Sequence, residues 1–206
     1  GLDLSSTTDL TALVLAVEPQ SADEPWRLLP MAWLPEQDLA QREHQDKVPY
    51  TQWVRDGMLS TTPGAAVSKL HVVQRLAALA EQFDIAAVAY DRWRINDLRS
   101  MAQDAGVELP PLVEFGQGYR DMAPAIEHFE SALLGGQLVH PGHPVLTWCA
   151  ANAVIVQDDA GNRKLSKRKA SGRIDLVLAA IMAMAIAARA PDEPLVIGSD
   201  YELAVA

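Results

Sequence analysis

The alternation of apolar and polar positions predicts three strands at the start of the chain. Residues 10–18 and 26–34 form apolar runs bounded by polar or proline-containing links, and a shorter strand holds Asp3. Pro30 in the third strand indicates an edge position or a bulge, because proline has no N–H for the sheet ladder. The short links between these runs fit antiparallel hairpins or a meander.

After residue 35 the pattern changes to helical spacing and then alternates between strands and helices. The helices are predicted over residues 35–47, 49–59, 67–83, 95–105, 121–134, 143–152 and 174–190. The further strands are predicted over residues 85–91, 112–115, 138–140 and 153–158. Three strands followed by alternating elements predict an α/β fold, with a mixed central sheet flanked by helices on both faces.

Composition indicates one large domain in a reducing compartment. The chain has 206 residues, 49% of them hydrophobic and one of them cysteine, Cys149. We expect a single domain over residues 1–190 and a loosely held, acidic tail over residues 191–206. The longest wholly apolar run, residues 176–188, is too short to span a bilayer, and no secretion signal is visible. These features predict a soluble cytoplasmic protein.

The charge is unevenly distributed along the chain. A formal net charge of −10 argues against a globally basic nucleic-acid binder. Residues 162–173 nevertheless hold six of the 17 basic residues and no acid. This stretch is either a solvated loop or a loop that binds phosphate groups.

Three carboxylates lie at positions that invite a functional interpretation. Asp3 sits inside an apolar strand, where its charge is costly unless a hydrogen-bond donor, a basic partner or a metal ion neutralises it. Asp91 ends the buried strand 85–91, at the strand end where sites gather in α/β sheets. Asp175 lies in the first turn of the last helix. Asp91 could instead be a simple turn residue, and Asp175 could merely complement the helix dipole.

If these three acids converge, they repel one another unless cations are bound. Carboxylate oxygens suit Mg²⁺ or Mn²⁺. Two such ions about 4 Å apart can hold the attacking and leaving oxygens of a phosphodiester. The three acids therefore indicate metal-assisted phosphodiester chemistry.

Six blocks of sequence, in this order, resemble the nuclease domain of the large terminase subunit of tailed bacteriophages. The blocks are GLDLSSTTDLTA, VPYTQWVRDGML with TTPG, AYDRW, EFGQGYRDM, HPVLTWCAANAVIVQDDAGNRKLSK and RIDLVLAAIMA. The resemblance runs from residue 1 to about residue 187. It implies an RNase H-like fold with its catalytic, metal-binding triad at Asp3, Asp91 and Asp175. It also places Asp9 near the metals, although Asp9 could equally be a turn residue.

The resemblance implies a metal-dependent endonuclease that cuts concatemeric viral DNA in the host cytoplasm, with two Mg²⁺ or Mn²⁺ ions as cofactors. It implies as partners double-stranded DNA, a terminase ATPase domain, a small terminase subunit and a portal protein. The basic stretch lies between the strand 153–158 and the helix that carries Asp175. It is thus tethered close to the proposed metals, so we expect DNA phosphates to be contacted by Lys164, Lys167, Arg168 and Lys169.

Other functions are compatible with parts of the sequence. GLDLSSTTD resembles the phosphate loop of actin-like ATPases and sugar kinases, but Ser5 stands where glycine is usual and 206 residues are too few for two lobes. A non-catalytic docking module has no need for the three acids. Another RNase H-like nuclease, of resolvase or transposase type, is a closer alternative, although VPYTQW and HPVLTW favour a terminase. The chain has no G-x-x-x-x-G-K-[ST] loop, so ATP-driven translocation is not assigned to it.

Overall fold

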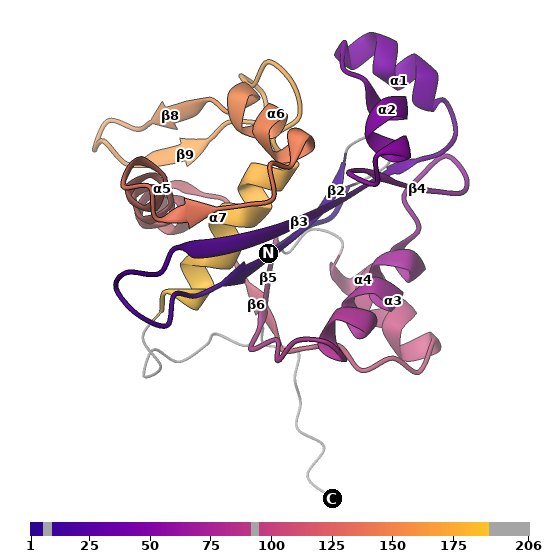
Figure 1. Cartoon of the computed structure of the whole chain (residues 1–206), viewed down its shortest axis with the longest axis horizontal. Coiled ribbons are helices and arrows are strands. Elements are labelled where there is room, and N and C mark those ends of the chain that lie inside the picture. The colour runs from indigo at the N-terminus through magenta and orange to yellow at the C-terminus, as the bar shows by residue number, and fades with distance from the viewer. Residues whose placement is uncertain (6–9, 92–94, 190–206) are drawn as a thin grey trace, which may run out of the picture.

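A mixed β-sheet forms the centre of the computed structural model, which describes residues 1–5, 10–91 and 95–189 (Figure 1). Its strands follow the order β4-β3-β2-β1-β5-β6, and β7 pairs with one end of β3. The strands of this sheet are β1 (Leu2–Asp3), β2 (Thr11–Val17), β3 (Trp26–Pro35), β4 (Ser60–Thr62), β5 (Val88–Tyr90), β6 (Leu112–Glu114) and β7 (Leu138–Val139).

The sheet combines an antiparallel meander with a parallel half, as the order of elements predicted. β1, β2 and β3 pair antiparallel in sequence, whereas β5 and β6 extend the sheet parallel to β1. β3 pairs in parallel with β7 at its first two residues and with β4 at its last three. Pro30 lies between these two pairings, where β3 is paired with β2. It thus occupies a locally edge-like position, where the missing N–H does little harm.

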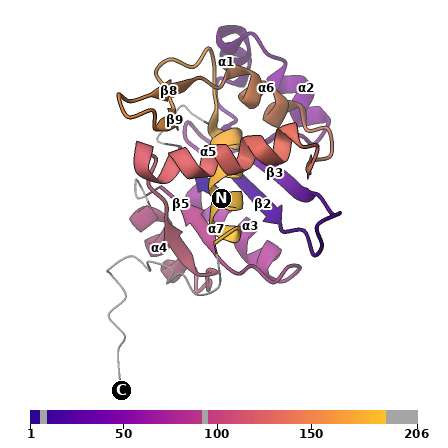
Figure 2. The same ribbon diagram turned by 90° about the vertical axis from the view of Figure 1, so that its left-hand side faces the viewer.

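Helices cover both faces of the sheet and build two hydrophobic cores. The helices are α1 (Leu39–Asp46), α2 (Tyr50–Arg55), α3 (Lys69–Ala80), α4 (Ile95–Asp104), α5 (Tyr119–Leu134), α6 (Pro144–Asn152) and α7 (Asp175–Ala187). One core joins α5, α6 and α7 to one face of the sheet, and the other joins α3 and α4 to the opposite face. Figure 2 shows α5 lying across α7 on its side of the sheet, while α1 and α2 lie next to β4 in Figure 1.

α7 is the central helix of the larger core. Its sequence DLVLAAIMAMAIA is apolar on all sides after the first residue, and it packs against β1, β2, β5, α5 and α6. Gly1 lies so close to the carbonyl oxygen of Ala179 that no Cβ could be accommodated there. β1 therefore runs directly along α7, and this contact brings Asp3 to the helix end that carries Asp175.

Two strands were not predicted, because their sequences lack an apolar alternation. β4 consists of Ser60, Thr61 and Thr62 and is defined by its pairing with β3. β9 (Arg163–Leu165) begins inside the basic stretch, so that stretch is not a loop throughout. β9 pairs antiparallel with β8 (Ile155–Gln157) in a separate two-stranded sheet, not in the central one. The Asp158 carboxylate closes this hairpin by accepting N–H bonds from Ala160 and Asn162 at 3.0 and 2.8 Å.

The predicted boundaries of the other elements differ from the observed ones by a few residues. The strand predicted over residues 85–91 pairs only at Val88–Tyr90, and the helix predicted from residue 121 begins at Tyr119. The predicted tail, residues 191–206, lies outside the described residues, so its separation from the domain stays a prediction. Among the described helices, none has the length and apolar character needed to cross a membrane.

Candidate active site

Asp3 and Asp175 meet where the end of β1 faces the start of α7. Asp3 is the last residue of β1 and pairs with Ala12 of β2, so its position is fixed by the sheet ladder. Asp175 is the first residue of α7. The two residues are only 4% and 2% exposed, respectively. Such burial is rare for aspartate unless the charge has a partner.

The partner is Lys167, from the segment between β9 and α7. Its ammonium Nζ donates to Asp3 Oδ2 at 2.7 Å and to Asp175 Oδ1 at 2.9 Å. The lysine side chain is 44% exposed, so it lies over the two buried carboxylates at the protein surface. Of the three ways to neutralise Asp3 that the sequence allowed, this structure shows the basic partner.

The electrostatics of this group follow from burial of two like charges. Burial raises the pKa of Asp175, the neighbouring Asp3 raises it further, and Lys167 opposes both effects. Burial by itself would lower the pKa of the Lys167 ammonium, but the two carboxylates outweigh it and hold the pKa above its usual value. Two carboxylates and one ammonium carry a formal net charge of −1, so Lys167 alone does not neutralise the pair.

Asp91 is placed on the strand beside Asp3. Leu2 of β1 is aligned with Tyr90 of β5, so the following residues, Asp3 and Asp91, lie along the same carboxyl edge of two parallel strands. Asp91 is half-buried. Within residues 1–5, 10–91 and 95–189, no three His, Cys, Asp or Glu side chains are close enough to form a metal site. The structure therefore unites two of the three predicted catalytic acids and leaves Asp91 on the neighbouring strand, and Asp9 lies outside the described residues.

The basic residues predicted to contact DNA lie in different settings. Lys167 is engaged by the two carboxylates, as described above. Lys164 extends from β9 over the ring of Tyr119 in α5, with Nζ 4.6 Å from the ring centroid. Arg168 and Lys169 follow Lys167 in an exposed turn. Among the described residues, Lys167 is the one of these four basic residues that pairs with Asp3 and Asp175.

A second polar group, which no sequence pattern predicted, lies just before Asp175. Arg173 Nε donates to Asp46 Oδ2 at 2.8 Å and to the Tyr50 hydroxyl at 3.0 Å. Asp46 ends α1 and Tyr50 begins α2, so the group joins a distant part of the chain to the start of α7. The VPYTQW block contains Tyr50, but no spacing in the sequence links it to Arg173.

The donor set of the acid pair fits a divalent cation. Two carboxylate oxygens already converge on one positively charged group, the Lys167 ammonium, at 2.7 and 2.9 Å. Asp3 and Asp175 would hold a Mg²⁺ or Mn²⁺ ion by the same oxygens, and Asp91 is the neighbouring acid that could complete the set. All these donors are hard oxygens, which excludes a site of the zinc–thiolate kind.

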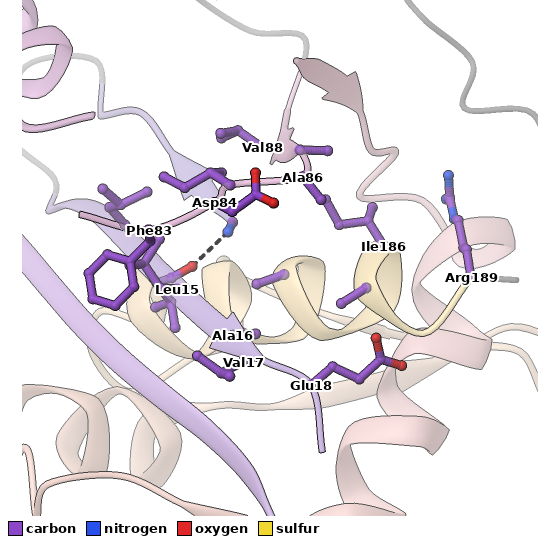
Figure 3. A pocket seen from close by; sticks show the side chains of 17 residues that line it. Leu15, Ala16, Val17, Glu18, Phe83, Asp84, Ala86, Val88, Ile186 and Arg189 are labelled. Carbon is purple, nitrogen blue, oxygen red and sulfur yellow. Dashed lines mark hydrogen bonds between the residues drawn. The ribbon is translucent and has the colours of Figure 1, made fainter. Parts of the chain in front are cut away.

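A cavity lies at the other end of α7. Its volume is about 520 Å³, and β2, residues 83–88 and the last turns of α7 line it. Figure 3 shows Leu15, Val88 and Ile186 around this space, with the charged residues Glu18 and Arg189 near its rim. Asp3, Asp91 and Asp175 do not line it. The cavity is therefore separate from the acid pair.

Comparison with known proteins places this arrangement in one family. Residues 1–191 match the family described as the terminase large subunit, endonuclease domain. The chain is 50% identical over 187 residues to the terminase large subunit of Enterobacteria phage HK97, and these residues are 91% of this chain and 36% of that protein. It is 27% identical over 138 residues to the protein YmfN of Escherichia coli strain K12, which covers 66% of this chain and 30% of that protein.

Two solved structures have the same fold. The crystal structure of the HK97 bacteriophage large terminase superposes with a TM-score of 0.83 at 49% identity, covering 90% of this chain and 38% of that one. The large terminase nuclease from thermophilic phage G20c superposes with a TM-score of 0.54 at 16% identity, covering 89% of this chain and 78% of that one. The central mixed sheet with helices on both faces is thus the RNase H-like fold of terminase nucleases, as expected. This chain, which spans little more than a third of the HK97 protein, belongs to the family of endonuclease domains of terminase large subunits.

Proposed function

We propose that the chain is a metal-dependent DNA endonuclease that cuts concatemeric phage DNA during genome packaging by two-metal-ion hydrolysis. One observation carries the proposal: two almost fully buried carboxylates, Asp3 and Asp175, converge on a single cationic group at the surface of the domain. Purely structural buried acids have no need to meet in pairs, because each added like charge costs stability. Membership of the endonuclease-domain family supports the same activity.

The residues of the site have distinct tasks in this proposal. Asp3 and Asp175 hold the cations by oxygens whose positions are fixed by a strand end and a helix start. Asp91, on the adjacent parallel strand, supplies the third carboxylate. When bound, Mg²⁺ or Mn²⁺ would lower the pKa of water and stabilise charge on the scissile phosphate. Lys167 holds the acid pair together by pairing with both carboxylates, and a bound metal would compete with its ammonium for the same oxygens.

The proposed substrate is double-stranded DNA, and its phosphates approach over the exposed basic residues. Lys164 lies in β9, and Arg168 and Lys169 lie in the segment between β9 and α7, on an otherwise acidic protein. Phosphate contacts of this kind position DNA without reading its bases, which fits cleavage with little sequence preference. A terminase ATPase domain, a small terminase subunit and a portal protein are the partners that we propose for the longer protein.

Cleavage of supercoiled plasmid by the purified chain tests this function. We expect nicked and linear products in Mn²⁺ or Mg²⁺ and none in EDTA. Asp3→Asn and Asp175→Asn should each abolish cleavage while leaving the fold intact. Asp97→Asn is the matched control, because Asp97 is 57% exposed and pairs with Lys69 at 3.3 Å on the opposite face of the sheet.

Three results would overturn the proposal. Cleavage that persists in Asp175→Asn would show that the active site lies elsewhere in the molecule. Binding of DNA with no metal-dependent cleavage would favour a docking module. A strong preference for branched DNA over linear duplex would instead favour a nuclease of the resolvase type.

A further inference from the structure

A buried polar group lies directly in front of the helix that carries Asp175. The Tyr50 hydroxyl donates to Asp46 Oδ2 at 2.6 Å, and Arg173 Nε donates to both groups. The side chains of Arg173 and Asp46 are 13% and 22% exposed. The Tyr50 ring is fully buried, with its edge-on neighbours Trp53 and Trp148 at 5.7 and 5.8 Å. Both ends of the group are therefore held rigidly.

A second tether holds the same segment from α6. Asn152, the last residue of α6, donates from Nδ2 to the carbonyl oxygen of Arg173 at 3.2 Å. Its Oδ1 accepts from the Ser171 hydroxyl at 3.0 Å. The backbone at residue 173 is thus fixed from one side by Asn152, while its side chain is fixed from the other side by α1 and α2.

The residue before α7, Ile174, has no side chain that can cap the helix. The backbone N–H groups of Asp175 and Leu176 lie against the Cys149 sulfur in α6. The tethered residues immediately before α7 therefore help to set the direction in which Asp175 leaves the backbone. Arg173 is two residues away and is the anchored one.

We infer that Asp46 and Tyr50 are positioning residues for the acid pair, acting through Arg173 on the placement of Asp175. This inference rests on the proposed metal-dependent nuclease function. Loss of Asp46 removes the hydrogen bond that ties Arg173 Nε to α1, so the segment 171–174 can shift and Asp175 moves relative to Asp3. Metal affinity depends steeply on such placement, and loss of an outer partner of a metal ligand typically costs about 10–100-fold in affinity or activity.

A purely structural role makes a different prediction. α1 has no buried residue of its own, so the Asp46–Arg173 pair could serve only to hold α1 onto the domain. In that case loss of the pair lowers thermal stability and leaves metal binding unchanged. The two roles are thus separated by a metal titration, not by stability.

The test compares Mn²⁺ binding by isothermal titration calorimetry in Asp46→Asn, Tyr50→Phe and Arg173→Gln. Glu130→Gln is the matched control, because Glu130 forms an equally close arginine pair, with Arg163 at 2.6 Å, between α5 and β9. We expect Mn²⁺ affinity to fall about tenfold or more in Asp46→Asn and Arg173→Gln. Tyr50→Phe, which keeps the ring packing, should lose a few-fold, and Glu130→Gln should lose stability alone. The DNA concentration for half-maximal cleavage should not change in any of them.

Each outcome decides one question. Wild-type Mn²⁺ affinity in both Asp46→Asn and Tyr50→Phe would overturn the positioning role while leaving the nuclease function intact. Weakened Mn²⁺ binding in a chain that never cleaves DNA would support the positioning role and overturn the nuclease function. A wild-type chain that binds no Mn²⁺ would overturn both, and the wild-type titration alone reveals it. If Asp46→Asn does not fold, Tyr50→Phe decides the question, with Asp46→Glu expected to restore part of the affinity.

Discussion

The two ends of α7 lie in contrasting environments, although they belong to one helix. At the first residue, Asp175 is buried beside Asp3 under the Lys167 ammonium. At the last turns, Ala183, Ile186 and Ala187 face a mostly apolar cavity of about 520 Å³ between β2 and residues 83–88, which Glu18, Asp84 and Arg189 also line (Figure 3). The helix between them is almost wholly apolar. One end therefore depends on specific charged partners, and the other needs only apolar surface.

The two ends of α7 differ in how much they reduce the stability of the fold. A cavity lined by apolar groups loses some packing contacts, but no group in it is left without solvation. Two adjacent buried carboxylates lose their hydration and repel each other, which is expensive unless cations are supplied. The chain supplies Lys167 from the segment between β9 and α7, and it anchors Arg173 with residues from α1 and α2.

Among these predictions, the largest effect is expected from Asp91→Asn. This variant tests whether the site at the start of α7 includes the acid that follows β5. We expect cleavage to fall by at least about a hundredfold, because the loss of a ligand exceeds the 10–100-fold cost of losing an outer partner. The thermal stability should change little, since Asp91 is only half-buried. Asp9→Asn should reduce cleavage less, and higher metal concentration should partly restore it. Plasmid cleavage over a Mn²⁺ series measures both effects, and normal cleavage by Asp91→Asn would exclude Asp91 from the site.

Lys167→Met should destabilise the metal-free protein, because two buried carboxylates then face each other without a counter-charge. We expect a loss of about 1–3 kcal/mol, less than for a fully buried pair because the lysine side chain is 44% exposed. Denaturant unfolding in EDTA measures this loss, and Mn²⁺ should restore more stability to the variant than to the wild type. Lys169→Met, two residues away and exposed, is the matched control.

The stability of Lys167→Met should also depend on pH in a defined direction. The pKa of Asp175 is already raised by burial and by Asp3, and removal of Lys167 raises it further. A carboxyl whose pKa is higher in the folded than in the unfolded state loses stability as the pH rises through the folded value. The loss in the free energy of unfolding caused by Lys167→Met should therefore be larger near pH 8 than near pH 5. A deficit that grows on acidification would contradict this account of the acid pair.

The contrast also explains what the sequence could predict. The apolar end of α7 follows from composition and periodicity, and so do the order of strands and helices and the helices on both faces of the sheet. The acids Asp3 and Asp175 were recognisable because a charge inside an apolar pattern is costly. The apolar periodicity and a charge inside an apolar run can both be recognised from neighbouring residues in the sequence.

The partners of those acids could not be predicted, because they depend on contacts between distant segments. Lys167 was one of six basic residues in its stretch, and nothing local distinguished it from Lys169. Asp46 at the end of α1 pairs with Arg173 across a long stretch of the chain, which no spacing in the sequence reveals. The strands β4 and β9 were missed for the same reason, since pairing with a neighbour defines them and their own residues do not.

Replacement of Lys164, Arg168 and Lys169 by alanine should weaken DNA binding and flatten its dependence on salt. Each phosphate contact contributes about 0.9 to the slope of log affinity against log salt, so the slope should fall by roughly two to three units. Lys69→Ala with Arg75→Ala, on α3 at the opposite face of the sheet, is the control pair. Fluorescence anisotropy over a salt series measures the slope. An unchanged slope would make the stretch a solvated turn and place the DNA contacts elsewhere.

The smallest effect is expected at the apolar end, from Ala187→Leu. Ala187 lines the cavity, so the larger side chain can enter existing space, and leucine is nearly as good a helix former as alanine. We expect a gain of up to about 1 kcal/mol in the free energy of unfolding, with cleavage and Mn²⁺ affinity unchanged. Ala180→Leu is the matched control on the same helix, because Ala180 is fully buried away from the cavity and overpacking there should cost about 1–3 kcal/mol. If Ala187→Leu weakened Mn²⁺ binding, the two ends of α7 would be coupled, and the separation of an apolar end from a charged, metal-binding end would not hold.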